Sequence, residues 1–172
     1  ENLVKLFTLL LIGVNYLNLI MIIEEKLKSL GIELPHPPKP AGSYIPVSII
    51  KDLAYVSGQI PMLNGKLRYT GKIPTPRTVE DGKSSAKLCA INALSQLKMK
   101  IGDLDRIVKI VRVSGFVNSS PDFTEHAQVI DGASDFLYQV FAEKGVHTRI
   151  AVGVSSLPLD ATTEIDMILE LS

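Results

Sequence analysis

The chain contains 172 residues with a mass of 18.8 kDa, a size that favours one domain with a substantial core. Its 18 basic and 18 acidic residues cancel, which argues against a general polyanion-binding protein, because such proteins carry a basic surplus. One cysteine excludes an internal disulfide and favours a reducing, cytoplasmic compartment. Together with three histidines, it cannot build a closed Cys/His zinc site.

The apolar residues 3–23 differ in composition from the rest of the chain. They are long enough to span a bilayer, but Lys5 and two asparagines would each be costly in hydrocarbon. A good signal-peptide cleavage site is missing, and Met21 would make a suitable start for the remaining chain. We therefore expect residues 1–23 to be an apolar, helical N-terminal extension. Residues 24–172 are expected to form a single domain that has no membrane partner.

Two strands are predicted after a proline-rich lead-in around Pro37, because proline and the residue before it avoid helix. Residues 43–50 and 53–60 alternate apolar and other side chains on either side of Lys51-Asp52. This pattern is typical of a β-hairpin.

A long helix is predicted over residues 77–101, with Thr78 as its N-cap and Gly102 as its end. Its apolar residues recur every three or four positions and indicate one stripe that faces a sheet. These residues are Leu88, Ile91, Leu94, Leu97 and Ile101.

The remaining segments predict one more helix and three more strands. Residues 106–117 are β-branched and favour a strand. Ser120-Pro121 then opens a second helix that Gly145 closes. Two final strands are expected at 148–156 and 162–171. The buried stripe of the second helix is expected to consist of Val129, Ala133, Phe136, Leu137, Val140 and Phe141.

The resulting order ββαβαββ predicts an α/β (α+β) domain, with a mixed sheet and two helices packed on one face. Charge is unevenly distributed along it. Between Lys66 and Arg112 there are eleven basic and four acidic residues, whereas the last sixty residues hold nine acidic residues and only Lys144 and Arg149 as bases. Two solvated faces of opposite sign explain this pattern, and so does head-to-tail association of subunits.

Several motifs do not support a site. Gly82-Lys83-Ser84 resembles the end of a phosphate-binding loop, but the first glycine of that motif is replaced by arginine. Cys89 lies among apolar residues of the first helix and is expected to be a buried, inert thiol. His36, His126 and His147 have no metal-like spacing and are expected at the surface or in loops. We therefore expect no metal site.

Arg149 is the most distinctive polar residue, because it opens an apolar strand in the acidic end of the chain. From the pattern alone it is either exposed, bound to an anion, or paired across the sheet with Glu164, and the cross-strand ion pair is favoured. Ser57 and Gly58 end the second strand of the hairpin, and glycine there allows close backbone approach. Tyr44 is a partly buried aromatic at a strand start.

These same residues carry a family resemblance. Ser43-Tyr44, residues 54–61 (AYVSGQIP) and residues 149–158 (RIAVGVSSLP), with Glu164 fifteen positions after Arg149, resemble blocks of the Rid family. This is the YjgF-like family of reactive enamine/imine deaminases, whose members are also called endoribonuclease L-PSP or translation initiation inhibitors. The blocks occur in order within residues 24–172 and are specific only in combination.

The resemblance implies a chorismate-mutase-like fold that forms a homotrimer with three clefts between subunits. It implies hydrolysis of 2-aminoacrylate-type enamines and imines to 2-keto acids and ammonia, with no cofactor. In this reading Arg149 holds the substrate carboxylate and Glu164 positions the water. Tyr44, Ser57 and Gly58 line the cleft.

Two other functions stay open. One is a non-catalytic regulator that binds small acids at Arg149. The other is a ribonuclease or translation inhibitor, against which the neutral charge and the lack of an aromatic and basic stacking surface both count. No specific nucleic-acid partner is expected.

Overall fold

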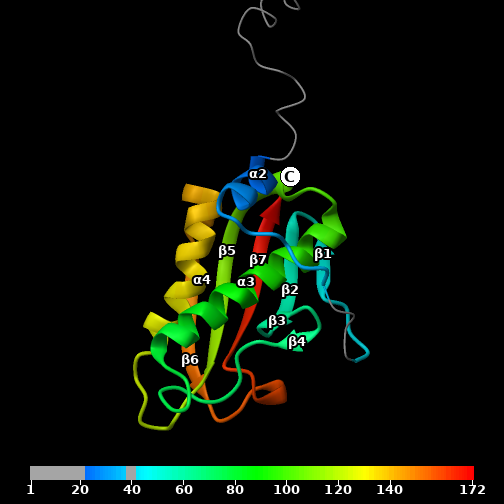
Figure 1. Cartoon of the computed structure of the whole chain (residues 1–172). Coiled ribbons are helices and arrows are strands. Elements are labelled where there is room, and N and C mark those ends of the chain that lie inside the picture. The colour runs from blue at the N-terminus through cyan, green and yellow to red at the C-terminus, as the bar shows by residue number, and fades with distance from the viewer. Residues whose placement is uncertain (1–21, 38–41) are drawn as a thin grey trace, which may run out of the picture.

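The computed structural model describes residues 22–37 and 42–172, and these form a five-stranded mixed sheet covered by helices (Figure 1). The strand order is β1-β2-β7-β5-β6. The strands are β1 (Val47–Ile50), β2 (Leu53–Gln59), β5 (Ile107–Asn118), β6 (Thr148–Val154) and β7 (Thr163–Leu171). The predicted fold class and the order ββαβαββ are confirmed.

The sheet combines antiparallel and parallel pairs. Strands β1 and β2 form the predicted hairpin, β2 pairs with β7, and β7 pairs with β5, all antiparallel. Strand β6 runs parallel to β5 at the edge, because helix α4 (His126–Phe141) forms the crossover between them. The two ends of the sheet are therefore β1 and β6.

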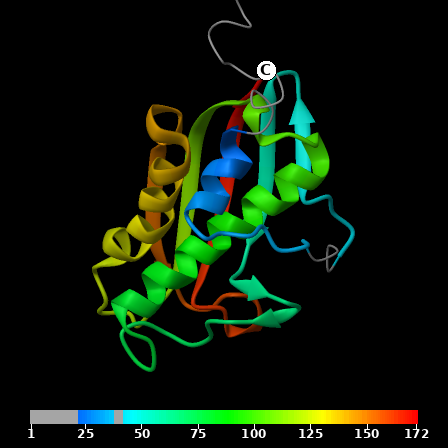
Figure 2. The same ribbon diagram turned by 45° about the horizontal axis from the view of Figure 1, so that its top comes forward.

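Helices α3 (Val79–Ile101) and α4 lie side by side on one face of the sheet, as predicted, and the other face carries no helix among the described residues (Figures 1 and 2). Thr78 caps α3 through a reciprocal capping box, in which its side chain accepts from the backbone of Asp81 and the carboxylate of Asp81 accepts from the backbone of Thr78. Gly102, at φ 80°, ends the helix.

Helix α3 packs with small residues more than with the predicted stripe. Leu94 and Leu97 are buried, whereas Leu88, Ile91 and Ile101 are only half-buried. The buried face also holds Ser85, Ala86, Cys89, Ala90 and Ala93, which lie closer to the sheet than leucines could. Cys89 is fully buried as expected, and burial raises the pKa of its thiol.

The second helix begins at His126 rather than at Pro121, so the predicted start is wrong. Residues 119–125 instead form a loop, in which the backbone N–H of Phe123 donates to the carbonyl of Ser120. Proline suits this turn as well as it suits a first helical position, and Phe123 anchors the loop in the core. The buried stripe of α4 is confirmed at all six predicted positions.

Three smaller elements complete the described fold. Strands β3 (Met62–Leu63) and β4 (Lys66–Leu67) form a small hairpin around Asn64-Gly65, both at positive φ. Helix α2 (Ile22–Ser29) contacts α4 and buries Ile23 and Leu27. Short 3-10 turns occupy Leu104–Arg106, Ala142–Gly145 and Pro158–Asp160.

No helix among residues 22–37 and 42–172 has the length and apolar character needed to cross a bilayer. The predicted extension lies almost entirely outside the described residues. Its last two positions, Ile22 and Ile23, belong to α2.

The crossing of α3 and α4 depends on two glycines. A side chain at Gly132 would overlap the carbonyl group of Lys83, and one at Gly82 would lie 2.9 Å from Val129. Gly82, part of the phosphate-loop-like motif, therefore has a packing role inside α3.

Gly132→Ala is expected to destabilise the fold by about 3 kcal/mol or more, because the clash involves backbone that cannot move aside. The free energy of unfolding in urea measures this. Gly42→Ala is a matched control, since its added methyl group would lie 3.6 Å from Tyr44, in ordinary contact. Equal unfolding midpoints for the two variants would contradict the prediction.

Candidate functional site

Arg149 lies near the start of edge strand β6, and its side chain points toward the helices. Its Nη1 donates to Oδ1 of Asp131 at 2.7 Å and to Oγ of Ser134 at 3.0 Å, both on α4. The side chain of Arg149 is 25% exposed, so the ion pair lies at the surface of the domain. Of the three readings left open by the sequence, the structure therefore shows an Arg149 that is paired, although not with Glu164.

Glu164 lies on β7 and its carboxylate is half-buried against the backbone of Gly58. It accepts no hydrogen bond and forms no ion pair among the residues that the structure describes. Burial, and secondarily the charge of Asp166, raises the pKa of Glu164. A half-buried carboxylate without a protein partner is available to a water molecule or a ligand.

The predicted ion pair between Arg149 and Glu164 is wrong, because the two side chains point to opposite faces of the sheet. Strand β5 lies between β6 and β7, with Val113 beside Arg149 and Phe116 beside Glu164. Val113 faces the helices and is fully buried, and a residue three positions away on a strand faces the other side. Arg149 thus lies on the helix side and Glu164 on the open side.

Ser57 and Gly58 lie beside Glu164 because β2 bulges there. The register between β2 and β7 shifts between Val56 and Gln59, which leaves Ser57-Gly58 out of the ladder. Gly58 allows Glu164 to approach the backbone closely, since a Cβ there would lie 1.8 Å from the carboxylate, which would have to move aside. A shallow, open pocket adjoins the bulge on the helix-free side, with a lining that includes Ile45, Ser48, Tyr55, Ser57, Gly58, Asp166 and Ile168.

Tyr44 lies three residues before β1 and is 51% exposed, so the expectation of a partly buried residue at a strand start is wrong. Its segment approaches the bulge, because the backbone N–H of Ser57 donates to the carbonyl of Pro46 at 2.9 Å. The chain therefore brings together Ser57, Gly58 and Glu164, places Tyr44 at their margin and leaves Arg149 apart.

Sequence reasoning missed the residues that surround Arg149. Ser134 bonds both Arg149 and His147, whose Nε2 lies 3.1 Å from Oγ of Ser134. Burial lowers the pKa of His147, and the charge of Arg149 adds to that effect. Asp131 and Ser134 are three positions apart on α4 and so share a helical face, which is the signal that could have indicated a polar site there.

A second pocket, of about 450 Å³, lies between β6 and the loop after β5. His126 faces it, with Nε2 3.2 Å from Oγ of Ser119, and this position exists because Gly153 has no side chain. The ammonium of Lys72 links the segments that line the pocket, because it donates to Asn118 Oδ1 and to the carbonyls of Ser119 and Ser155. His126 is thus a pocket residue rather than a simple surface residue.

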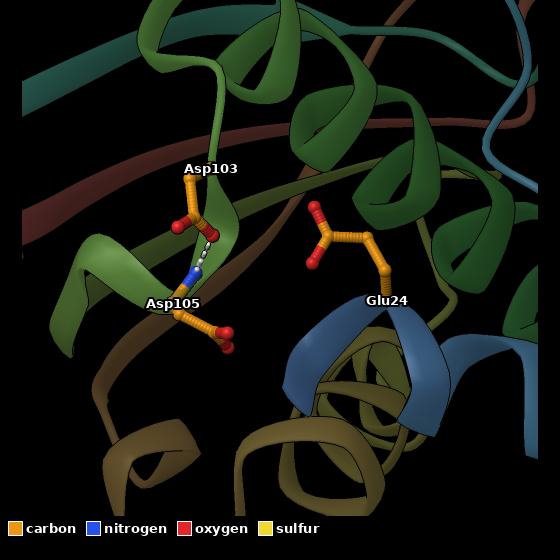
Figure 3. Close-up of side chains that lie close together, drawn as sticks. All are labelled: Glu24, Asp103 and Asp105. Atoms are coloured by element: carbon orange, nitrogen blue, oxygen red, sulfur yellow. Dashed lines mark hydrogen bonds between the residues drawn. The ribbon is translucent and has the colours of Figure 1, made fainter. Parts of the chain in front are cut away.

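Three carboxylates gather at the opposite end of the molecule, on Glu24, Asp103 and Asp105 (Figure 3). Each has a structural partner. Asp105 accepts from the first two backbone N–H groups of α2, Asp103 accepts from the backbone of Asp105, and Glu24 pairs with Lys98. The cluster therefore fixes the start of α2 against the turn at Leu104–Arg106.

Known proteins resemble this chain over most of its length. The family described as "YjgF/chorismate mutase-like, putative endoribonuclease" matches residues 24–171. Protein TCP17 of Trypanosoma cruzi is 40% identical over 151 residues, which cover 87% of this chain and 94% of that protein.

Solved structures are similar over most of the chain. The protein Atu1372 of unknown function from Agrobacterium tumefaciens is 43% identical, with a TM-score of 0.83 over 88% of this chain and 93% of its own. RidA from the Antarctic bacterium Psychrobacter sp. PAMC 21119 is 20% identical, with a TM-score of 0.57 over 79% of this chain and 94% of its own, and shares the fold. The chain therefore belongs to the YjgF/chorismate mutase-like family.

Proposed function

We propose that the protein hydrolyses reactive 2-enamino and 2-imino acids to 2-keto acids and ammonia, in clefts formed between subunits of a homotrimer. The observation that carries this proposal is Glu164, a half-buried carboxylate that has no partner among the described residues and lies against Gly58. Its raised pKa suits a group that exchanges protons with water. Family membership and the Rid-like blocks around Arg149 support the same reaction.

The chemistry requires few groups. An enamine becomes an imine when its terminal carbon takes a proton. Water then adds to the imine carbon, Glu164 accepts one proton from it, and the proton passes to the nitrogen. The C–N bond breaks as the hydroxyl oxygen forms the new C=O bond and releases its proton to solvent, which balances the proton that the carbon took up. Ammonia leaves and the 2-keto acid remains. Arg149 holds the neighbouring carboxylate through a charge-assisted fork, which fixes the carbon for attack.

A cleft between subunits reconciles these roles with the positions of the side chains. Within one chain Arg149 and Glu164 lie on opposite faces of the sheet, so they cannot meet over one substrate. Two subunits can bring them together if the β6 edge of one, with Arg149, approaches the open sheet face of the next, with Glu164. That open face also exposes Tyr55 and Ile150, whose apolar area favours burial.

Arg149→Lys is expected to lower kcat/KM by about 100-fold, because a lysine ammonium has no bidentate fork. The measurement couples an enamine-generating enzyme to 2-keto acid release and subtracts the spontaneous rate. Arg106→Lys is the matched control, since among the described residues the Arg106 side chain bonds the backbone carbonyl of Ser172, and the variant should stay within about twofold of wild type. Wild-type activity in Arg149→Lys would overturn the proposal. If the wild-type protein binds 2-keto acids but does not accelerate ammonia release, it is instead a small-acid regulator.

Mixing two inactive variants tests the shared cleft. Light scattering should give the mass of a trimer. Co-refolded Arg149→Ala and Glu164→Gln subunits should regain about one quarter of wild-type activity, because one cleft in four takes an intact Arg149 from one subunit and an intact Glu164 from its neighbour.

The control is Arg149→Ala mixed with the Arg149→Ala/Glu164→Gln double variant, which should stay inactive. Failure of the first mixture to regain activity, in verified mixed trimers, would contradict a cleft that combines two subunits.

A further inference from the structure

The hydrogen bonds of Arg149 determine which edge of its guanidinium is left for a ligand. The group has five N–H donors, of which Nη1 carries two. Both Nη1 hydrogens are directed at α4, to Oδ1 of Asp131 and Oγ of Ser134. The edge formed by Nε and Nη2 has no bonding partner among the residues that the structure describes.

One short contact determines which group donates in each hydrogen bond that joins His147, Ser134 and Arg149. Nδ1 of His147 lies 2.6 Å from the carbonyl oxygen of Gly145, which can only accept, so Nδ1 carries the proton. Burial holds His147 neutral at neutral pH, so its Nε2 is an acceptor. The hydroxyl of Ser134 therefore donates to His147 and offers its lone pairs to Arg149.

We propose that Asp131, Ser134 and His147 are positioning residues for Arg149. They hold its Nη1 end against α4, so that the Nε–Nη2 edge receives the substrate carboxylate side-on. This inference rests on the proposed function, because it adds a support to the residue that binds the carboxylate.

Two physical effects make the arrangement useful. A free arginine side chain loses rotamer entropy when it binds a ligand, and two fixed hydrogen bonds remove that cost in advance. The carboxylate of Asp131 is 45% exposed, so solvent screens its repulsion of a second carboxylate. Asp131 can therefore orient Arg149 without cancelling the attraction of Arg149 for an anion.

Removing the support should weaken carboxylate binding and leave the chemical step unchanged, because Arg149 holds the carboxylate in both the ground state and the transition state. Asp131→Ala is expected to raise the KM, and the Kd for pyruvate in an NMR titration, about tenfold, with kcat within about twofold. Asp131→Asn should change both constants by less than about threefold, since its amide oxygen still accepts from Nη1. Ser134→Ala should raise both about threefold.

Ser29→Ala is the matched control, because it removes an exposed hydroxyl that donates to the carbonyl of Lys26 within α2 and should leave both constants unchanged. A KM and Kd that fall in Asp131→Ala would show that Asp131 competes with the substrate, and unchanged constants would show a purely structural ion pair. Either outcome overturns the inference. If Asp131→Ala proves unfolded by circular dichroism, Ser134→Ala, which loses only one hydroxyl, decides the question in the same way.

Failure of this inference is distinguishable from failure of the proposed function. If Arg149→Ala still binds pyruvate and releases ammonia as wild type does, the proposed function fails. If Arg149→Ala loses both while Asp131→Ala and Ser134→Ala behave as wild type, only the positioning role fails.

Discussion

Strand β5 lies between β6 and β7, and its pairing with both neighbours determines which face each polar residue of those strands occupies. The parallel register with β6 places Arg149 beside Val113, and the antiparallel register with β7 places Glu164 beside Phe116. Because side chains alternate along a strand, a slip of one residue on either side would exchange the faces. Burial alternates residue by residue along β7, so a slip of that strand would expose its buried side chains and is costly. The strand register that packs the core therefore also places Arg149 and Glu164 on opposite faces of the sheet.

The close crossing of α3 and α4 extends that constraint to the surroundings of Arg149. Gly132 lets the backbones of the two helices come into contact, and this contact positions α4 along the edge strand. Asp131 directly precedes this glycine and Ser134 follows it by two residues, and both bond Arg149 of β6. The polar contacts of Arg149 therefore depend on the close backbone packing of α3 and α4 at Gly132.

The order of elements was predictable from the sequence because each element has its own signal. Periodicity and caps identify α3, and β-branched runs identify β5. The start of α4 was misplaced because Pro121 fits both a helix start and a turn, and the choice depends on the burial of Phe123. The surroundings of Arg149 and Glu164 were unpredictable from local pattern, since adjacency in sequence does not reveal that β5 lies between their strands. The sequence indicated close approach at Ser57 and Gly58. It did not indicate that the approaching group is the carboxylate of Glu164, because that contact depends on the tertiary fold.

Gly153 is the smallest residue that lines the pocket around His126, and its substitution would change that pocket the most. The imidazole lies over β6 only because this one position has no Cβ. Gly153 is exposed and belongs to an edge strand, so replacement by a larger residue would leave the core and the sheet ladder intact. One substitution at Gly153 would displace the imidazole of His126 and change the groups that line the pocket of about 450 Å³. A fold with this property can change the lining of a surface pocket in single steps, at a position whose variation costs little stability.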